Sequence, residues 1–398
     1  MTEDQEIIRI AAKGDGVSTD GRHYARTAPG DTVKSDGTIV QGPHHVVPLC
    51  RHFGTCGGCQ LQHLDEISLA GFVTDRVVNA AAGQAIEVGE LLPTYLSPRK
   101  SRRRATMHAM RVHNGAVIGF REAGSHRIVD LKECHVVAPE IFAAIEPLRS
   151  FVARHAGKGN LDIELTLVDQ GIDCSIRNLT LEGLAETEAA VELAQSAGFA
   201  RLSINQGYGA ETMWEPEPAT VTLSGVATPI PAGSFLQATR DAEDVMVADA
   251  LAWSQGASTI ADLFSGLGTF SFALAKGAKV LAVEAAREQH LACKTAAGVS
   301  GRPVHAMHRD LFRNPLMSNE IGRFDSVVLD PPRAGAKEQV GQIAASDVSR
   351  VIYISCNPSS WAKDARKLVE AGFRLEALRP VGQFRWSTHV ELTSYFTR

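Results

Sequence analysis

The spacing of apolar residues changes near residue 235. From about residue 100 to 230, short runs alternate between apolar and polar positions, as in ATMHAMRV, AVIGFR, HRIVDL, LDIELTLV and IDCSIRNL. A period of two is typical of strands with one buried face, so we expect a mostly antiparallel sheet here. One helix, the Ala-rich LEGLAETEAAVELAQSAG that ends at Gly198, is expected to interrupt these strands.

Beyond residue 235, apolar strands alternate with helices. The expected strands are TIADLF, KVLAVE, VHAMHRDLF, DSVVLDPP and VIYISCN, and the expected helices are SFALAKG, AAREQHLACKTAAG and SSWAKDARKLVEAG. This order predicts a parallel sheet covered by helices on both faces. The closing strands FRLEALRPV and HVELTSYF are joined by a short loop, which predicts an antiparallel pair at one edge.

The first residues have a third pattern, in which turn signals rich in Gly and Asp separate the short apolar stretches IIRI and TIVQ. This pattern predicts a small β-module. We therefore expect three parts: the β-module at 1–46, a β-rich central domain at 47–230 and an α/β domain at 231–398.

Charge and composition limit the kinds of partner, cellular location and cysteine chemistry that the sequence supports. The formal net charge is −5, so any nucleic acid must be held by a local basic patch. The start MTEDQEIIRI is acidic, and no apolar run approaches about 18 residues, so we expect a cytoplasmic protein without membrane contact. Seven cysteines in such a chain favour metal binding or catalysis over disulfides. Nothing in the sequence indicates an obligate protein partner.

The first strand of the α/β domain ends in a glycine turn, DLFSGLGTF at 262–270. Glycines let the backbone approach a ligand closely, and Glu284, at the end of the next strand, could accept hydrogen bonds from a ribose. A dinucleotide fingerprint would need a third glycine where this chain has Ser271. The pattern favours S-adenosylmethionine over NAD, although Gly-x-Gly is about as often a plain turn.

Two further strand ends carry reactive groups. Asp330 opens the stiff loop DPPRAG, in which Arg333 could stack on a base, grip a phosphate or be a solvated side chain. Cys356 follows VIYIS and precedes a helix, whose N-terminus would lower the pKa of the thiol. A thiolate beside a methyl donor suggests addition to carbon 6 of uracil, which activates carbon 5. Glu391, or His389 on the same face, could then remove the carbon-5 proton, unless Glu391 is merely an exposed acid.

A cysteine cluster lies nearer the start of the chain. Cys50, Cys56 and Cys59 have the spacing C-x5-C-x2-C, and Cys134 follows in DLKECHVV. Four thiolates can hold zinc or an iron–sulfur cluster, and spacing does not choose between the two. Cys174 and Cys293 lie inside amphipathic patterns and are expected to be inert core residues.

A basic run, RKSRRR at 99–104, stands out in an acidic chain. With the nearby Arg111, Arg121 and Arg127, it could line a phosphate-binding groove or be an ordinary solvated face. The aromatic rings of Phe120, Phe235 and Phe384 could stack displaced bases or belong to the core.

Together these pieces resemble the RNA uracil-C5-methyltransferase family, in particular its iron–sulfur branch that acts on 23S ribosomal RNA. The matching segments are CRHFGTCGGCQLQHL, GFREAGSHRIVDLKEC, GSFLQAT, DLFSGLGTF, LDPPRAG, YISCNPSS and HVEL. The resemblance implies a Rossmann-like domain that uses S-adenosylmethionine, with Cys356 as nucleophile and Glu391 as base. It implies a [4Fe–4S] cluster on Cys50, Cys56, Cys59 and Cys134. It also implies cofactor contacts at Gln237, Phe264, Thr269, Glu284, Asp310 and Asp330.

The resemblance is weaker near the N-terminus. Residues 14–33 look like part of a TRAM domain, an RNA-binding β-barrel, but the stretch between Val33 and Cys50 is too short for its usual last strands. Smaller departures are Ser265, where the family often has cysteine, and Ala238-Thr239, where it often has Val-Asn. Two other functions remain open: methylation of transfer RNA, which the cysteine cluster disfavours, and a non-catalytic iron–sulfur RNA-binding protein, which would need neither Cys356 nor the DPPR loop.

Overall fold

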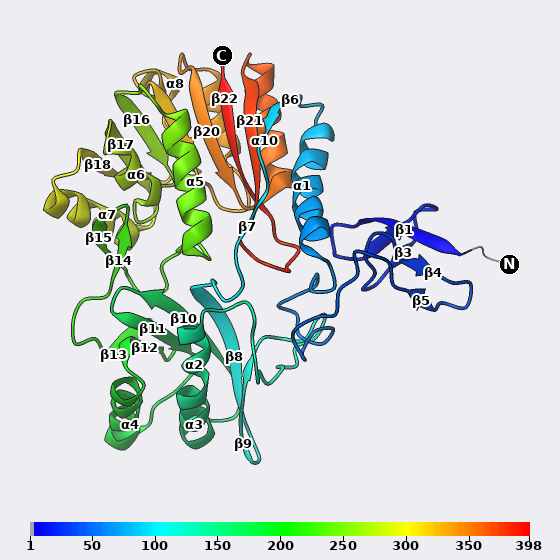
Figure 1. Cartoon of the computed structure of the whole chain (residues 1–398). Helices are drawn as coiled ribbons and strands as arrows, with labels where there is room; N and C mark the ends of the chain where they lie inside the picture. Colours follow the sequence, from blue (N-terminus) through cyan, green and yellow to red (C-terminus); the bar gives the residue numbers. More distant parts are fainter. Residues whose placement is uncertain (1–3) are drawn as a thin grey trace.

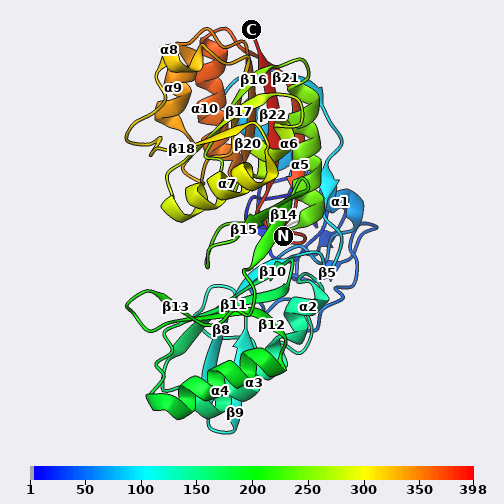
Figure 2. The ribbon, with the colours of Figure 1, turned by 90° about the vertical axis from the view of Figure 1, so that its left-hand side faces the viewer.

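The computed structural model describes residues 4–398, which form three bodies (Figures 1 and 2). The smallest, at the N-terminus, is a five-stranded sheet in the order β3-β2-β1-β4-β5. Its strands are β1 (Gln5–Ile10), β2 (Gly16–Ser18), β3 (His23–Tyr24), β4 (Thr32–Val33) and β5 (Ile39–Val40). The predicted stretches IIRI and TIVQ fall in β1 and β5, so the β-module is confirmed as a sheet.

The central body is a six-stranded sheet with helices α2 (Pro139–Ala143), α3 (Ile145–His155) and α4 (Gly183–Ser196). The strand order is β13-β12-β11-β10-β8-β9, and only β11 and β12 run parallel. The strands are β8 (Arg104–Val112), β9 (Gly115–Gly119), β10 (Asn160–Val168), β11 (Gly171–Arg177), β12 (Phe199–Asn205) and β13 (Ala210–Trp214). The mostly antiparallel sheet and the helix α4 are confirmed. The single-helix prediction was wrong, because α2 and α3 also form, and HRIVDL contributes only an isolated bridge at Ile128.

The C-terminal body is built on a sheet in the order β18-β17-β16-β19-β20-β22-β21-β6, with β7 (Tyr95–Leu96) also pairing β21. Strands β16 to β20 are parallel, and β22 runs antiparallel to both β20 and β21. The strands are β6 (Val88–Leu91), β16 (Thr259–Leu263), β17 (Lys279–Glu284), β18 (Val304–His308), β19 (Ser326–Leu329), β20 (Arg350–Ser355), β21 (Arg374–Gly382) and β22 (Glu391–Thr397). The parallel sheet and the antiparallel closing pair are as predicted, but the edge belongs to β6.

Helices cover both faces of this sheet (Figures 1 and 2). They are α1 (Glu66–Ala82), α5 (Arg240–Trp253), α6 (Thr269–Leu274), α7 (Arg287–Ser300), α8 (Ser318–Ile321), α9 (Lys337–Ala344) and α10 (Pro358–Glu370). The local sequence explains why helix α10 begins at Pro358. Asn357 caps the helix by accepting a hydrogen bond from the N–H of Ser359, and Pro358 occupies the first turn. Its apolar face buries Trp361 and Leu368 against the sheet.

One segment crosses the predicted boundaries. Helix α1 packs on α10 and β21, and β6 and β7 pair in parallel with β21. These elements lie within the range 47–230 but belong to the C-terminal sheet, because β21 offers them an edge and α1 buries Leu69, Phe72, Val73 and Val77 there. Within residues 4–398, no helix is long and apolar enough to cross a membrane.

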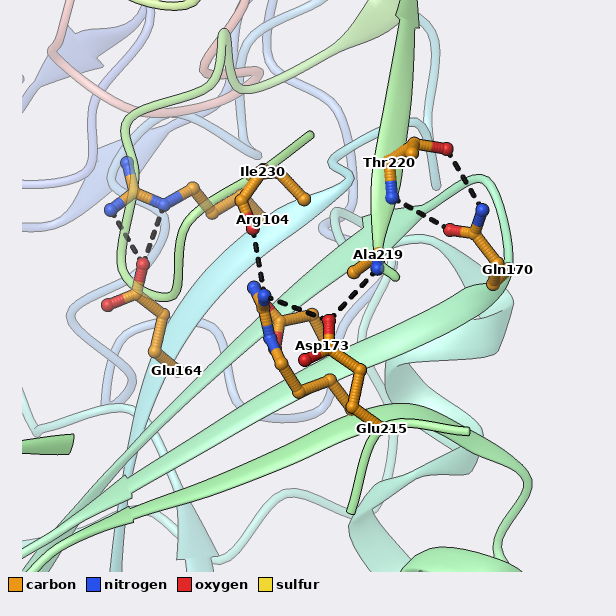
Figure 3. Close-up of polar contacts among 9 residues, drawn as sticks. Arg104, Glu164, Gln170, Asp173, Glu215, Ala219, Thr220 and Ile230 are labelled. Atoms are coloured by element: carbon orange, nitrogen blue, oxygen red, sulfur yellow. Dashed lines mark hydrogen bonds and ion pairs between the residues drawn. The ribbon is translucent and has the colours of Figure 1, made fainter. Parts of the chain in front are cut away.

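A buried ion pair in the central sheet also contacts the segment around Glu215, Ala219 and Ile230, which leads to the C-terminal body (Figure 3). Arg201 donates to both carboxylate oxygens of Asp173, at 2.8 and 2.6 Å, and to the carbonyl of Ile230 at 2.8 Å. It also reaches Glu215, whose carboxylate accepts from the N–H of Ala219. These contacts tie the central sheet to the hairpin of β14 (Thr220–Leu223) and β15 (Val226–Pro229), which precedes the cofactor-binding candidate Gln237.

Replacing Arg201 with methionine should lower the free energy of unfolding by about 3–5 kcal/mol, because the Asp173 carboxylate would remain buried without its partner. Urea denaturation followed by circular dichroism measures the loss. The control is Arg177→Met, which removes a half-exposed arginine 3.8 Å from Asp162 and should change the stability by less than about 0.5 kcal/mol. Equal effects of the two substitutions would contradict the structural role of the buried pair.

Candidate active site

Six neighbouring strands bring the predicted site residues to one edge of the C-terminal sheet. In the order β18, β17, β16, β19 and β20, the residues at or just beyond the carboxyl ends are Asp310, Glu284, Phe264, Asp330 and Cys356. Strand β22 runs the other way, so Glu391, its first residue, lies at the same edge. The carboxyl edge of such a sheet is where ligands bind.

The glycine turn after β16 is anchored on Glu284. One carboxylate oxygen accepts from the N–H of Gly266 at 2.9 Å and the other from that of Ala286 at 2.6 Å. Gly268 has φ +97°, and a Cβ there would lie 2.7 Å from the Phe272 ring, so only glycine suits this position. Helix α6, whose first residue is Thr269, begins directly afterwards.

Two aromatic rings form one wall beside this turn. Phe264 has φ +63°, an uncommon conformation for a residue with a side chain. Its ring lies 5.4 Å from that of Phe312. Phe312 follows Asp310, whose carboxylate accepts from the N–H of Phe312 at 3.0 Å. Sequence reasoning did not single out Phe312, although its position two residues after Asp310 was a usable signal.

A chain of side-chain contacts joins the two carboxyl groups of the site. Gln237 donates to Asp330 at 3.2 Å and accepts from the amide of Gln383 at 3.0 Å. Gln383 also hydrogen-bonds Glu391. Sequence reasoning missed Gln383, which lies at the start of the loop between β21 and β22 without a recognisable motif.

Both carboxyl groups are buried, and burial raises their pKa values. The pKa of Glu391 rises to about 7, although Gln383 and the charge of Arg333 partly oppose the effect. The pKa of Asp330 is raised well above its usual value by burial and by the nearby charges of Glu391 and Asp262. Glu391 is 4% exposed, so the alternative of an exposed acid on an edge strand was wrong.

The Cys356 thiol is half-buried next to these carboxyl groups. Burial, Glu391 and Asp330 raise its pKa to about 11, while Arg333 acts in the opposite direction. Desolvation and these two acidic neighbours therefore outweigh the lowering of the pKa that we expected from the helix N-terminus.

The DPPR loop is bound to the start of α10. The carbonyl of Arg333 accepts from the Asn357 amide at 2.9 Å and from the Ser360 hydroxyl at 3.0 Å. The Arg333 guanidinium lies 2.6 Å from Nδ1 of His389. Burial and the charges of Arg333 and Arg102 lower the pKa of His389. Arg333 is therefore an exposed residue whose guanidinium lies against His389, beside the nucleophile candidate.

The four clustered cysteines also lie together. Cys50, Cys56, Cys59 and Cys134 line one cavity, together with Phe120 and Arg102. Burial and the neighbouring thiols raise the pKa values of the first three, that of Cys59 to about 12. In the described part of the chain, no three His, Cys, Asp or Glu side chains are grouped so as to hold a single metal ion. Cys174 and Cys293 are buried in the core, as predicted.

The basic run at 99–104 is only partly available to RNA. Arg103 is buried and paired with Glu243 at 2.5 Å, and Arg104 donates to Glu164 at 2.9 and 2.7 Å (Figure 3). Arg99 and Lys100 are exposed. Only part of the positive charge of this run is therefore exposed, and the groove that we considered stays a prediction. Phe235, one of the three rings considered for base stacking, is 61% exposed. The Arg104 guanidinium lies 5.6 Å from the centroid of its ring.

Known proteins resemble the chain over its whole length. It is 46% identical over 395 residues to an uncharacterized RNA methyltransferase of Zymomonas mobilis, covering 99% of this chain and 100% of that protein. The family model of tRNA (uracil-5-)-methyltransferases matches residues 305–398, which include Asp330, Cys356 and Glu391. The chain belongs to the RNA uracil-C5-methyltransferase family. This enzyme is an RNA methyltransferase whose methyl donor is S-adenosylmethionine.

Two further known proteins that are similar to the enzyme have substrates in their names. The 23S rRNA (uracil(1939)-C(5))-methyltransferase RlmD of Alteromonas mediterranea is 29% identical over 376 residues, covering 90% of this chain and 77% of that protein. The tRNA (uracil-54, C5)-methyltransferase of Pyrococcus abyssi, solved with S-adenosyl-L-homocysteine, has a TM-score of 0.77 at 23% identity over 99% of both chains. The latter shows that the methyltransferase fold is shared.

Proposed function

We propose that this enzyme methylates carbon 5 of a uridine in 23S ribosomal RNA through a covalent bond between Cys356 and carbon 6. The observation that carries the proposal is the meeting of the Cys356 thiol and the buried Glu391 carboxyl at the sheet edge that also presents the glycine turn. The rival non-catalytic function would leave this pair and the DPPR loop unexplained.

The reaction runs in four steps. The half-exposed Cys356 thiol gives its proton to solvent, and the thiolate adds to carbon 6, which makes carbon 5 nucleophilic. S-adenosylmethionine, when bound, would supply the methyl group to carbon 5 and would leave as S-adenosylhomocysteine. Glu391 then takes the proton from carbon 5, and the electrons of that bond restore the ring double bond as sulfur leaves. Because Nδ1 of His389 is paired with Arg333, Glu391 is the better-placed base.

S-adenosylmethionine fits the residues at the other end of the edge. The hydroxyl of Ser265, in the glycine turn, is buried without a hydrogen-bond partner among residues 4–398, so the turn has an unmet polar group. The rings of Phe264 and Phe312 offer apolar faces for an adenine. Together they support cofactor binding by Gln237, Phe264, Thr269, Glu284, Asp310 and Asp330. To bind a ribose, Glu284 would use the same carboxylate that already accepts a hydrogen bond from the N–H of Gly266 in the glycine turn.

Comparison of ribosomal and transfer RNA tests the substrate. In cells that lack this chain, 5-methyluridine should disappear from a site in 23S ribosomal RNA and remain in transfer RNA. The relative RlmD supports ribosomal RNA, and the four cysteines are the feature that the transfer-RNA branch generally lacks. Loss of 5-methyluridine from transfer RNA alone would replace this proposal by its rival. An RNA substrate also supports the predicted cytoplasmic location.

The four cysteines of the central domain are proposed to hold a [4Fe–4S] cluster. The support is the chemistry of the donor set, four thiols from two separate segments lining one cavity. The cluster, when bound, needs to supply no redox step to this reaction. Anaerobically purified protein should contain about four irons and four sulfides per chain, and Cys59→Ser should lose most of them. Stoichiometric zinc without sulfide would contradict the cluster and favour a zinc site.

We keep 1–46, 47–230 and 231–398 as the proposed functional domains. In the fold, however, the segment 66–96 packs with the C-terminal sheet. The five-stranded N-terminal sheet supports a TRAM-like module. It contacts the segment that follows Cys59, since a ring nitrogen of His63 lies 3.1 Å from the carbonyl oxygen of Thr27. This module therefore adjoins the proposed cluster.

The pH dependence of the reaction should follow Glu391. Its pKa of about 7 means that the base is protonated, and cannot accept the carbon-5 proton, as the pH falls below that value. We expect product release to slow by about tenfold per pH unit below about pH 7. Single-turnover measurements of RNA release test this expectation. Adduct formation with RNA containing 5-fluorouridine is the control, because it needs no proton removal from carbon 5: it should follow the ionisation of Cys356, whose pKa is about 11, and show no break near pH 7.

A further inference from the structure

Arg102 lies between the cysteine-lined cavity and the proposed uridine site. Its guanidinium lines the cavity together with the four thiols. Its backbone N–H donates to Val136 at 3.1 Å, and its carbonyl accepts from Ala138 at 2.9 Å, so it is paired with the segment that follows Cys134. The side-chain Nε donates to the carbonyl of Arg104 at 2.9 Å. These bonds hold the guanidinium against the cavity wall.

The other side of the guanidinium begins a row of contacts that leads to the nucleophile. Its central carbon lies 5.2 Å from the centroid of the Phe384 ring, and that ring meets His389 edge-on at 5.8 Å. His389 contacts the Arg333 guanidinium at 2.6 Å, and the Arg333 carbonyl accepts from Asn357, the neighbour of Cys356. The row is therefore continuous from the cavity to the thiol.

A second connection joins the same two regions through the backbone. The carbonyl of Trp386 accepts from the N–H groups of Gln60 and Leu61, at 2.8 and 3.0 Å. Gln60 directly follows Cys59, and Trp386 lies in the loop that carries Phe384 and leads to Glu391. Two backbone hydrogen bonds therefore tie the segment that follows Cys59 to the loop that leads to Glu391.

We propose that Arg102 is a positioning residue that couples the occupancy of the cysteine-lined cavity to the geometry of the uridine site; this inference rests on the proposed function. Four thiolates around a cluster carry net negative charge, which attracts a guanidinium strongly in a desolvated place. Within residues 4–398, the guanidinium makes no hydrogen bond beyond that of Nε, so its remaining donors are available to sulfur. With Arg102 drawn to the cavity, Phe384, His389 and Arg333 keep their places beside Cys356.

The test compares two arginines of the same basic run. Arg99→Met is the matched control, because Arg99 is exposed and also lies over a ring of the 383–390 loop, at 5.8 Å from Trp386, but does not line the cavity. The holoenzyme variants are assayed for iron release to a chelator and for the maximal rate of adduct formation with RNA that contains 5-fluorouridine. S-adenosylmethionine affinity is measured in parallel.

Arg102→Met should release iron faster and form the adduct about 10- to 100-fold more slowly, with unchanged S-adenosylmethionine affinity. Arg99→Met should keep iron release and, at saturating RNA, the maximal rate of adduct formation within about twofold of the parent, since a lost contact between an exposed arginine and a phosphate would weaken RNA binding and not the maximal rate. Phe384→Leu, which interrupts the row beyond the cavity, should slow the adduct but leave iron release unchanged. If Arg102→Met does not fold, Phe384→Leu tests the coupling by itself.

Each contrary outcome has a distinct meaning. If Arg102→Met and Phe384→Leu matched Arg99→Met in both iron release and adduct formation, and the parent still formed its adduct, the coupling would be overturned and the proposed function would stand. A parent protein that holds iron but forms no adduct would overturn the proposed function itself. Slower adduct formation with an equal loss of S-adenosylmethionine affinity would also overturn the coupling, because it would indicate general damage to the fold.

Discussion

Replacing Cys356 with alanine should abolish methylation, with a fall in rate of at least about 10⁴-fold, because the covalent route needs its sulfur to activate carbon 5. Incubation with S-adenosylmethionine and 5-fluorouridine-containing RNA measures the effect directly. The parent enzyme should give a denaturant-resistant protein–RNA band, and the variant should give none. Cys356 is half-buried and does not support the core, so the fold should survive.

The control for this variant is cofactor binding. Cys356→Ala should still bind S-adenosylmethionine, because the glycine turn and Glu284 are untouched. A matched substitution at Cys174, which is buried in the central sheet, should keep the adduct and lower stability instead. Methylation by Cys356→Ala at a rate near that of the parent would refute the covalent route.

Replacing Glu391 with glutamine should trap the enzyme on ordinary RNA after the methyl group has been transferred. Glutamine has the same shape and can still hydrogen-bond Gln383, but it cannot take the proton from carbon 5. We expect release of methylated RNA to slow by about 10²- to 10⁴-fold. With a radiolabelled methyl group, the label should appear in a denaturant-resistant protein–RNA band.

Two matched variants identify the base. Glu338→Gln changes an exposed carboxylate on α9 and should behave as the parent enzyme does. His389→Gln removes the contact with Arg333 and should slow adduct formation without trapping the methylated intermediate. Trapping by His389→Gln, together with rapid release by Glu391→Gln, would transfer the role of base to the histidine.

The residues at the carboxyl edge of the sheet could be predicted from the sequence, because each of them directly follows a strand that is visible in the local pattern. Each parallel strand is a continuous apolar run, and the residue that follows it must lie at the carboxyl edge. Glu284, Asp330 and Cys356 could therefore be grouped without coordinates. The family resemblance added Glu391, for which strand alternation left His389 equally eligible.

What the sequence could not provide depends on segments far apart in the chain. The pKa of Cys356 is set by burial and by Glu391 and Asp330, which no local rule about helix ends anticipates. Arg103 reads as a surface charge in RKSRRR, yet it is buried against Glu243, about 140 residues away along the chain. Gln383 has no motif and gains its importance only through Gln237.

The pairing of β6 with β21 has a consequence for how the protein is made. Residues 88–91 leave the ribosome long before their partner strand, Leu375 to Leu378, has been translated. Until then the strand and the apolar face of α1 have nothing to cover them, a state that invites misassociation or chaperone binding. A truncated gene product that starts at residue 231 would have the opposite defect, an open flank on β21, and should precipitate unless the missing N-terminal piece is supplied in trans.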